Sequence, residues 1–237
     1  MYKYQAIAEK LKKKFTDGSF QPGAVLPDQE QLAVEFGTTR MTIRKAIQSL
    51  IVEGVVYTKR GSGTFLRKDF ASKRDAFAPI LNKPLGATTN YAGHEVTSKI
   101  LELDARLPTP AEQDYLVIGP EEPVYVIRRT RYIDGKIYDY ERTIMPTKIA
   151  PITRKVVARS IYQYLAKEAG IRIAGAHRKV YAIKATAEDA EGLGATIGDP
   201  VLVINQVGYT DEGEPFEYSI THLPYLTNAV VADVEIR

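Results

Sequence analysis

The sequence predicts an α+β protein in which a small basic helical domain precedes a larger, mildly acidic domain built on an antiparallel sheet. Three observations support this prediction. Residues 1–74 hold 14 Lys and Arg against 7 Asp and Glu, whereas the other 163 residues hold 18 against 22. The basic part contains three short helical patterns followed by a hairpin pattern. The acidic part repeats a pattern of strand, short helix and long hairpin.

The composition excludes several other classes of protein. The 237 residues are 44% hydrophobic and 26% charged, which excludes a disordered or fibrous chain. No apolar run approaches the ~20 residues of a membrane span, and the first residues lack the apolar core of an export signal. The chain has no Cys, which excludes disulfides and fits a cytoplasmic location. The three His residues lack metal-ligand spacing, so we expect no metal and no cofactor.

Two helices are expected first in the basic part. Apolar residues recur every three or four positions across residues 4–15, with lysines between them, which indicates an amphipathic helix. Asp28 is placed to cap a second, short helix, and Gln31 stands at the capping-box position three residues later. Gly37 is placed to end that helix in a left-handed conformation.

A third helix begins a few residues later, which is the spacing of a helix-turn-helix. In that arrangement the first residues of the second helix of the pair face the major groove of DNA. Arg donates to guanine edges and phosphates, and Thr donates to phosphates or contacts a thymine methyl group. We therefore expect DNA contacts from Thr39, Arg40, Thr42, Arg44 and Lys45.

A hairpin with a bare, basic tip follows the third helix. Lys59 and Arg60 supply charge for phosphates. Gly61, Ser62 and Gly63 carry no bulky side chain, so their backbone can approach a narrow groove. We expect all five residues to contact DNA.

Residues 1–68 resemble the winged helix-turn-helix of GntR-type bacterial transcription regulators. The resemblance implies that Arg40 and Arg44 contact base edges and that Gly63 and its neighbours enter the minor groove. It departs at Glu30, where the family often carries an Arg. The matching positions are Leu26-Pro27, Leu32-Ala33, Gly37, residues 39–46, Leu50, Gly54 and residues 61–65.

Residues 69–79 have mixed charge and no clear period, so we expect a linker there, between a domain at 1–68 and another at 80–237. In the second domain, two halves repeat at a spacing near 77 residues. The matches occur in the same order in both halves, from Thr109 and Thr186 to Met145-Pro146 and Leu223-Pro224. The strands are expected at 95–103, 123–133 and 136–145, and again at 177–186, 200–210 and 215–222. A helix closed by glycine is expected at 160–170.

A set of short motifs marks the second domain, at residues 129–132, 134–135, 140–141, 145–146, 160–162 and 214–219. In these stretches the domain resembles the UTRA effector domain of the HutC branch of the GntR regulators. The resemblance implies a chorismate lyase-like fold and a small ligand, often a sugar phosphate or a small carboxylic acid. After Ser219 the chain departs from the family pattern, because a Tyr and an Arg are missing from their usual places.

Arg129 and Arg131 alternate on one predicted strand and therefore share a face of the sheet. The hairpin register decides whether Glu141 joins them. A two-residue Asp134-Gly135 loop would place Glu141 on the opposite face, whereas a three-residue loop with a bulge gathers Arg129, Arg131, Asp139 and Glu141. We expect the second register, which makes an anion clamp beside hydroxyl acceptors. The alternative is an exposed ladder of ion pairs across the strands.

Other ligand-binding candidates follow from matching position in the resemblance or from a nearby loop. The resemblance implies that Ser160, at a helix start, donates a hydrogen bond through its hydroxyl group. It also implies that Tyr162 lines the ligand pocket and that Glu217 accepts a hydrogen bond from a sugar hydroxyl. Thr88 and Thr89 offer donors in a loop.

Taken together, these patterns and the two resemblances predict a dimeric, ligand-responsive transcriptional regulator. It would act as a repressor on a pseudo-palindromic operator in double-stranded DNA, released by a small anionic metabolite such as a sugar phosphate. Two alternatives remain. One is a small-molecule lyase-like enzyme, and the other is a DNA-binding protein with a C-terminal domain that only dimerises.

Overall fold

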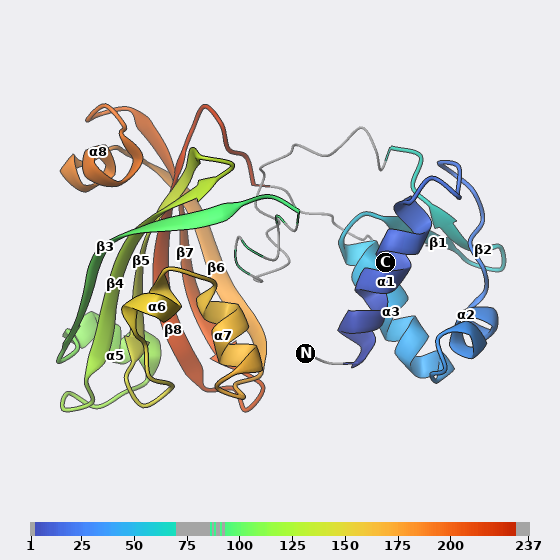
Figure 1. The fold of residues 1–237 in the computed structure, drawn as a ribbon, viewed down its shortest axis with the longest axis horizontal. Coiled ribbons are helices and arrows are strands. Elements are labelled where there is room, and N and C mark those ends of the chain that lie inside the picture. Colours follow the sequence, from blue (N-terminus) through green and yellow to red (C-terminus); the bar gives the residue numbers. More distant parts are fainter. Residues whose placement is uncertain (1–2, 70–85, 87, 89–90, 92, 231–237) are drawn as a thin grey trace. The chain divides into compact units, whose positions relative to one another are not determined.

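The computed structural model describes residues 3–69, 86, 88, 91 and 93–230, which belong to two compact units (Figure 1). The boundary between the two units falls between residues 82 and 83. Beyond residue 69, the linker predicted at 69–79 is outside the described residues. The domain boundaries given above therefore stay predictions.

The first unit contains three helices and a two-stranded hairpin, in the predicted order. One core joins them, with fully buried side chains from every helix that include Leu11, Phe15, Leu32, Ile43 and Leu50. The elements are α1 (Lys3–Thr16), α2 (Gln29–Glu35), α3 (Arg40–Val52), β1 (Val56–Lys59) and β2 (Gly63–Leu66).

Local hydrogen bonds fix the starts of α2 and α3. Asp28 accepts two backbone N–H groups in the first turn of α2, and the Gln31 side chain accepts from the N–H of Asp28, which completes the predicted capping box. Thr39 caps α3 by accepting from the N–H of Thr42. Gly37 has a φ of 55° just after α2, as predicted. These caps hold the helix starts in which the DNA-binding candidates lie.

The second unit is a six-stranded antiparallel sheet in the order β3-β4-β5-β8-β7-β6. The strands occur where the repeat predicted them, although β6 begins at residue 173 rather than 177, and the short helix α6 was not predicted. The elements are β3 (Val96–Arg106), α5 (Pro110–Leu116), β4 (Val124–Ile133), β5 (Lys136–Pro146), α6 (Arg154–Val157), α7 (Ile161–Lys167), β6 (Ile173–Lys184), α8 (Ala187–Leu193), β7 (Pro200–Thr210) and β8 (Pro215–Pro224).

The strand order confirms the predicted internal duplication. Each half contributes three adjacent strands, and the halves meet where β5 pairs with β8. The helix between the first and second strand of each half begins with the same motif. Thr109 caps α5 with Glu112 in a capping box, and Thr186 caps α8 with Asp189 in the same way.

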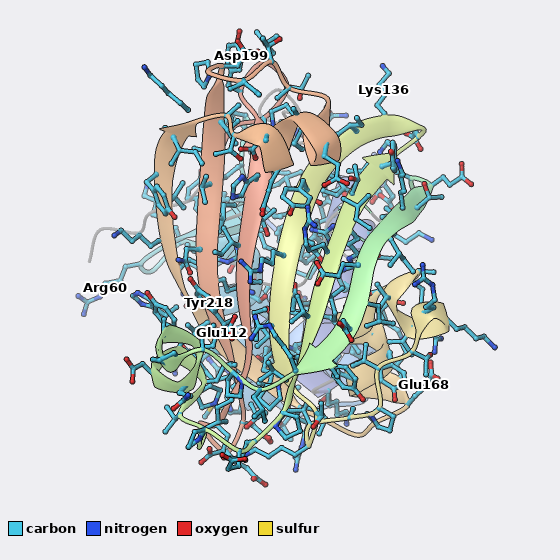
Figure 2. The ribbon with its side chains drawn as sticks, turned by 90° about the vertical axis from the view of Figure 1, so that its left-hand side faces the viewer. Arg60, Glu112, Lys136, Glu168, Asp199 and Tyr218 are labelled. Carbon is cyan, nitrogen blue, oxygen red and sulfur yellow. The ribbon has the colours of Figure 1, made fainter. Side chains whose placement is uncertain are left out.

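Helices cover both faces of the sheet. Figure 1 shows α6 and α7 in front of the strands and α5 behind them. On the α5 face, Tyr115 stacks on Tyr218 at 4.2 Å between ring centroids, and Figure 2 shows Tyr218 beside that helix. Because neighbouring strand residues alternate, Arg128 faces α8 and hydrogen-bonds Tyr140, whereas Arg129 faces the α6–α7 side.

The β4–β5 hairpin has the predicted register but not the predicted turn. Arg129 pairs with Glu141, as expected. The loop has two residues rather than three, and both Asp134 and Gly135 have positive φ (49° and 76°), as a type I′ turn requires. The expectation of a three-residue loop was therefore wrong. The register is kept because a β-bulge inserts the extra residue, Tyr138, into β5.

Candidate DNA-binding surface and effector site

The predicted DNA-binding residues of α3 lie together at its start. Thr39 is the N-cap, and its hydroxyl oxygen is 2.9 Å from that of Thr42. Arg44 and Lys45 are exposed in the next positions, and neither makes a hydrogen bond or ion pair with a described residue. Their charges therefore remain available to a polyanion.

Arg40 is held by an ion pair that joins the two helices of the motif. Its Nη1 donates to Oε1 of Glu30 at 2.8 Å, and the two side chains are 67% and 73% exposed. Glu30 lies in the first turn of α2. The structure thus brings Glu30 beside the predicted reading residues, where the sequence marked it only as a departure from the family.

The hairpin tip also has the predicted character. Lys59 pairs with Gly63, so residues 60–62 form the turn. Gly61 and Gly63 have φ values of 75° and 112°, which other residues rarely adopt. Every predicted residue from Lys59 to Gly63 is exposed, and the side chains of Lys59 and Arg60 make no ion pair with a described residue. Figure 2 shows the Arg60 side chain extending away from the hairpin.

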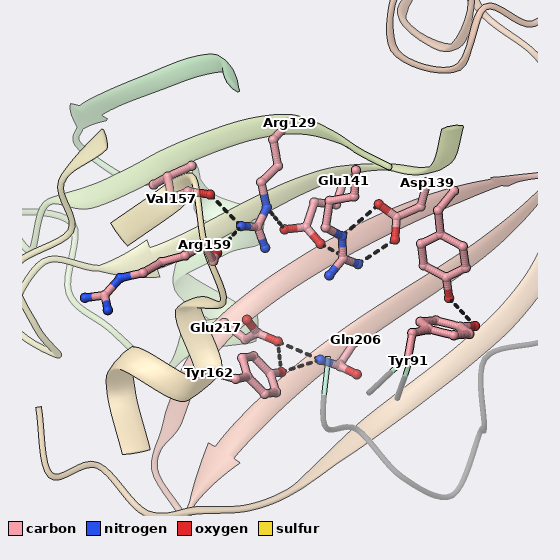
Figure 3. A network of polar contacts seen from close by, with 11 residues as sticks. Tyr91, Arg129, Asp139, Glu141, Val157, Arg159, Tyr162, Gln206 and Glu217 are labelled. Carbon is pink, nitrogen blue, oxygen red and sulfur yellow. Dashed lines mark hydrogen bonds and ion pairs between the residues drawn. The ribbon is translucent and has the colours of Figure 1, made fainter. Parts of the chain in front are cut away.

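The predicted effector residues of β4 and β5 form a buried cluster of alternating charge (Figure 3). Arg129 Nε donates to Glu141 Oε1 at 2.5 Å. Arg131 holds both carboxylate oxygens of Asp139, at 2.9 and 2.5 Å, and its Nη2 lies 3.0 Å from Glu141 Oε2. Asp139 is 0% exposed, Arg129 5% and Glu141 6%. The alternative of an exposed ion-pair ladder is therefore wrong.

Two buried carboxyl groups, Glu141 of the cluster and Glu217 of β8, differ in acidity. Burial acts to raise the pKa of Glu141, but the charges of Arg129 and Arg131 outweigh it, and the pKa lies below its ordinary value. Burial raises the pKa of Glu217 above its ordinary value, although Tyr162 donates a hydrogen bond to that carboxylate. Glu141 is therefore firmly ionised, and Glu217 is the more readily protonated acid.

A second group of polar residues extends the cluster onto β7 and β6. Gln206 Nε2 lies 2.6 Å from Glu217 Oε1 and 2.8 Å from the Tyr162 hydroxyl (Figure 3). Arg178 Nε donates to Gln206 Oε1 at 2.5 Å. The sequence interpretation missed both Gln206 and Arg178. Gln206 had a signal, because it follows Arg129 by the 77-residue spacing of the repeat.

Ser160 is tied to the cluster through the turn in which it lies. It caps α7 by accepting from the N–H of Gln163 at 3.2 Å, which leaves its hydroxyl proton free to donate. The carbonyl oxygens of Val157, at the end of α6, and of Arg159, just before Ser160, accept from Arg129 Nη1 at 2.7 and 3.0 Å. Arg129 therefore links β4 to the turn before α7.

The predicted loop candidates are only partly described. Thr88 is half-buried and makes no hydrogen bond with a described residue, and Thr89 lies outside the described residues. The hydroxyl of Tyr91, just after them, donates to that of Tyr138 at 3.1 Å. This contact places Tyr91 beside the bulged part of β5.

The cluster can bind an anion that also carries hydroxyl groups. Among the described residues, Arg129 Nη2 and Arg131 Nη1 have no hydrogen-bond partner, so both can donate to a ligand. The carboxylates can accept from hydroxyls. The described residues contain no group of three or more His, Asp or Glu placed to hold a metal ion.

These features define a class of protein. Exposed basic residues on a winged helix-turn-helix, joined in one chain to a sheet unit with a buried polar cluster, make a DNA-binding regulator with a ligand-binding domain. Residues 3–66 match the bacterial regulatory proteins of the gntR family, and residues 91–225 match the UTRA domain. The chain belongs to the GntR family and is a DNA-binding transcriptional regulator with an effector domain, not an enzyme.

Similar proteins cover nearly the whole chain. The transcriptional regulator GmuR of Bacillus subtilis is 34% identical over 100% of both chains. The repressor NagR of Bacillus subtilis is 28% identical, over 91% of this chain and 88% of its own. The crystal structure of YydK from Bacillus subtilis superimposes with a TM-score of 0.80 at 31% identity and covers 99% of this chain and 100% of its own. Of the helices in the described residues, none is long and apolar enough to cross a membrane.

Proposed function

We propose that this regulator is a repressor, released from a pseudo-palindromic operator in double-stranded DNA when a sugar phosphate binds the UTRA domain. Two relatives support repression rather than activation, because NagR and MngR are both named repressors. The name of MngR, a protein of Escherichia coli that is 26% identical, refers to mannosyl-D-glycerate transport and metabolism. Such a repressor acts on the chromosome, in the cytoplasm of the bacterial cell.

The proposed DNA contacts divide into base reading and phosphate binding. Arg40 and Arg44 reach base edges from the start of α3, while the Thr hydroxyls and Lys45 contact phosphates. Lys59, Arg60 and the glycine tip of the hairpin approach the minor groove. The supporting observation is that these residues are exposed or half-buried in the first two turns of α3 and at one hairpin tip.

One observation carries the effector proposal: Arg129 and Arg131 are each fixed by a carboxylate, yet each keeps one Nη group without a hydrogen-bond partner among the described residues. Guanidinium groups held in this way lose little freedom when they bind a phosphate. Asp139 and Glu141 cancel much of their charge, so a bare anion gains less than one that also donates hydroxyls to the cluster. A sugar phosphate offers both groups.

The other predicted residues complete the proposed site. Ser160, Thr88 and Thr89 donate to the phosphate, and Tyr162 and Glu217 meet sugar hydroxyls. Binding lowers operator affinity only if the ligand prefers one arrangement of two protomers over the other. We therefore propose a homodimer, with twice the 26.4 kDa mass of the chain.

Thermal unfolding tests the effector proposal. The full chain is heated with glucose 6-phosphate, mannose 6-phosphate, the parent hexoses or inorganic phosphate. A ligand at 100 times its Kd stabilises the folded state by about 2.7 kcal/mol, which corresponds to a Tm rise of roughly 5–11 °C for a chain of this size. We expect that rise with a hexose phosphate and at most a small one with phosphate or hexose alone.

The matched control removes Arg131 together with its partner Asp139, so that neither is left as a buried, unpaired charge. Arg131→Met combined with Asp139→Leu should abolish the rise. An equal rise in this variant, or stabilisation by hexoses regardless of phosphate, contradicts the proposed site. Light scattering of the same samples checks the dimer.

A further inference from the structure

We propose that Glu30 is a specificity-determining residue of the DNA-binding surface: it positions Arg40 and itself accepts a hydrogen bond from a cytosine amino group. The inference rests on the proposed reading of bases by Arg40. It adds a second reading residue, from α2, and a chemical class of base pair to that surface.

The first step is the geometry of the pair. Glu30 and Arg40 belong to the first turn of α2 and of α3, and the caps Asp28 and Thr39 fix both turns. The pair is made by one oxygen and one nitrogen, Oε1 and Nη1, 2.8 Å apart. Among the described residues, Glu30 Oε2 and Arg40 Nη2 have no hydrogen-bond partner. Each side chain therefore keeps a polar atom that can face a base.

The second step is that stability does not account for the pair. Ion pairs between side chains as exposed as these, at 73% and 67%, contribute roughly 0–1 kcal/mol in water. A carboxylate on a surface that meets phosphates is repelled by them, and residues 1–74 hold 14 Lys and Arg against 7 Asp and Glu. Glu30 is thus unfavourable for general DNA binding, and a benefit must come from a specific contact.

The third step is the chemistry of the major groove. A guanidinium recognises O6 and N7 of guanine, and a carboxylate accepts from N4 of cytosine. When Arg40 is held by Glu30, the donor and the acceptor are presented side by side. Such a pair selects a guanine for Arg40 and a cytosine for Glu30 in the same or the adjacent base pair. It also rejects guanine and thymine at the position of Glu30, because neither base presents a donor to the carboxylate in the major groove.

The experiment selects binding sites from a pool of random double-stranded DNA at fixed salt, with full-length protein. The variants are Glu30→Ala, Arg40→Ala and a control, Glu35→Ala. Glu35 is also exposed on α2 and pairs with Lys14 at 2.6 Å, so its removal changes the net charge equally. Affinities for the selected site and for a scrambled site are then measured for each variant.

We expect Glu30→Ala to lose the preference for one C·G pair that coincides with, or adjoins, the position lost in Arg40→Ala. Its affinity for the selected site should fall about 5- to 150-fold, the range for one base-specific contact, while its affinity for scrambled DNA rises. Glu35→Ala should keep the wild-type base preferences.

Three results overturn the proposal. If Glu30→Ala selects the same site as the wild type with unchanged affinity, Glu30 is only half of a surface ion pair. If Glu35→Ala reproduces its effect, only net charge matters. If Arg40→Ala keeps every base preference, the proposed base reading itself fails, and this outcome is recognised independently of Glu30.

Discussion

Replacing Arg131 by Met should strongly destabilise the effector unit, which is the unit that contains the six-stranded sheet. The substitution leaves a buried carboxylate without its partner. Asp139 is 0% exposed, and both of its oxygens accept from Arg131. Breaking one side of such a pair costs about 3–5 kcal/mol, a large share of the ~5–15 kcal/mol that stabilises a typical domain. At roughly 2–4 °C per kcal/mol, the Tm of this unit should fall by about 6–20 °C.

A second variant separates the loss of the pair from the burial of an unpaired charge. Arg131→Met with Asp139→Leu removes both charges and replaces them with apolar side chains, an exchange that is often neutral or stabilising. We expect its unfolding free energy to lie within about 2 kcal/mol of the wild type. The double variant should then be more stable than Arg131→Met alone by at least about 1 kcal/mol.

Urea unfolding followed by tyrosine fluorescence is suited to this measurement. The chain has no Trp, and 12 of its 15 Tyr lie beyond residue 90, so the signal reports mainly the effector unit. Lys148→Met is the control, since Lys148 pairs with Glu122 at the surface and its loss should cost less than about 1 kcal/mol. If Arg131→Met costs no more than this control, or if the double variant is no more stable than the single one, the reasoning is refuted.

Three further predictions concern other parts of the chain. Because burial raises the pKa of Glu217, the folded state keeps its proton where the unfolded state has lost it, and stability falls as the pH rises from about 4.3 through the raised value. Glu217→Gln should therefore gain stability relative to the wild type across that window, and a pH-independent difference in urea unfolding contradicts this. Gly192→Ala places a Cβ 2.5 Å from the Tyr140 ring and should cost about 1–3 kcal/mol, as overpacking does; an unchanged unfolding midpoint argues against it. If the hairpin contacts phosphates, Lys59→Ala should reduce the slope of log binding constant against log salt concentration by about 1 in magnitude. Its affinity should fall equally for the selected and the scrambled DNA.

The DNA-binding unit was predictable because its signals are local. The Asp28 capping box, the Thr39 cap and the left-handed Gly37 each depend on residues within a few positions, and all three are present. The Glu30–Arg40 contact could not be found in this way. It spans ten residues and a turn, and no period relates its two members.

The effector unit was predictable only where the repeat or strand alternation applied. Alternation placed Arg129 and Arg131 on one face, and the ordered matches gave the sheet its two halves. The bulge at Tyr138 was missed, because a loop and a bulge can give the same register and Tyr138 packs against the distant Tyr91. Arg178 was missed because its partner Gln206 lies on another strand.

The most direct test of the account is operator affinity with and without effector. The selected DNA site is titrated with the wild type and with the Arg131→Met, Asp139→Leu variant, in saturating hexose phosphate and without it. Allosteric coupling of about 1–3 kcal/mol predicts that the ligand weakens wild-type binding roughly 5- to 150-fold. The variant should bind DNA as the wild type does without ligand and should ignore the hexose phosphate. Wild-type affinity that stays unchanged under saturating ligand, or a variant that responds as fully as the wild type, contradicts the central claim.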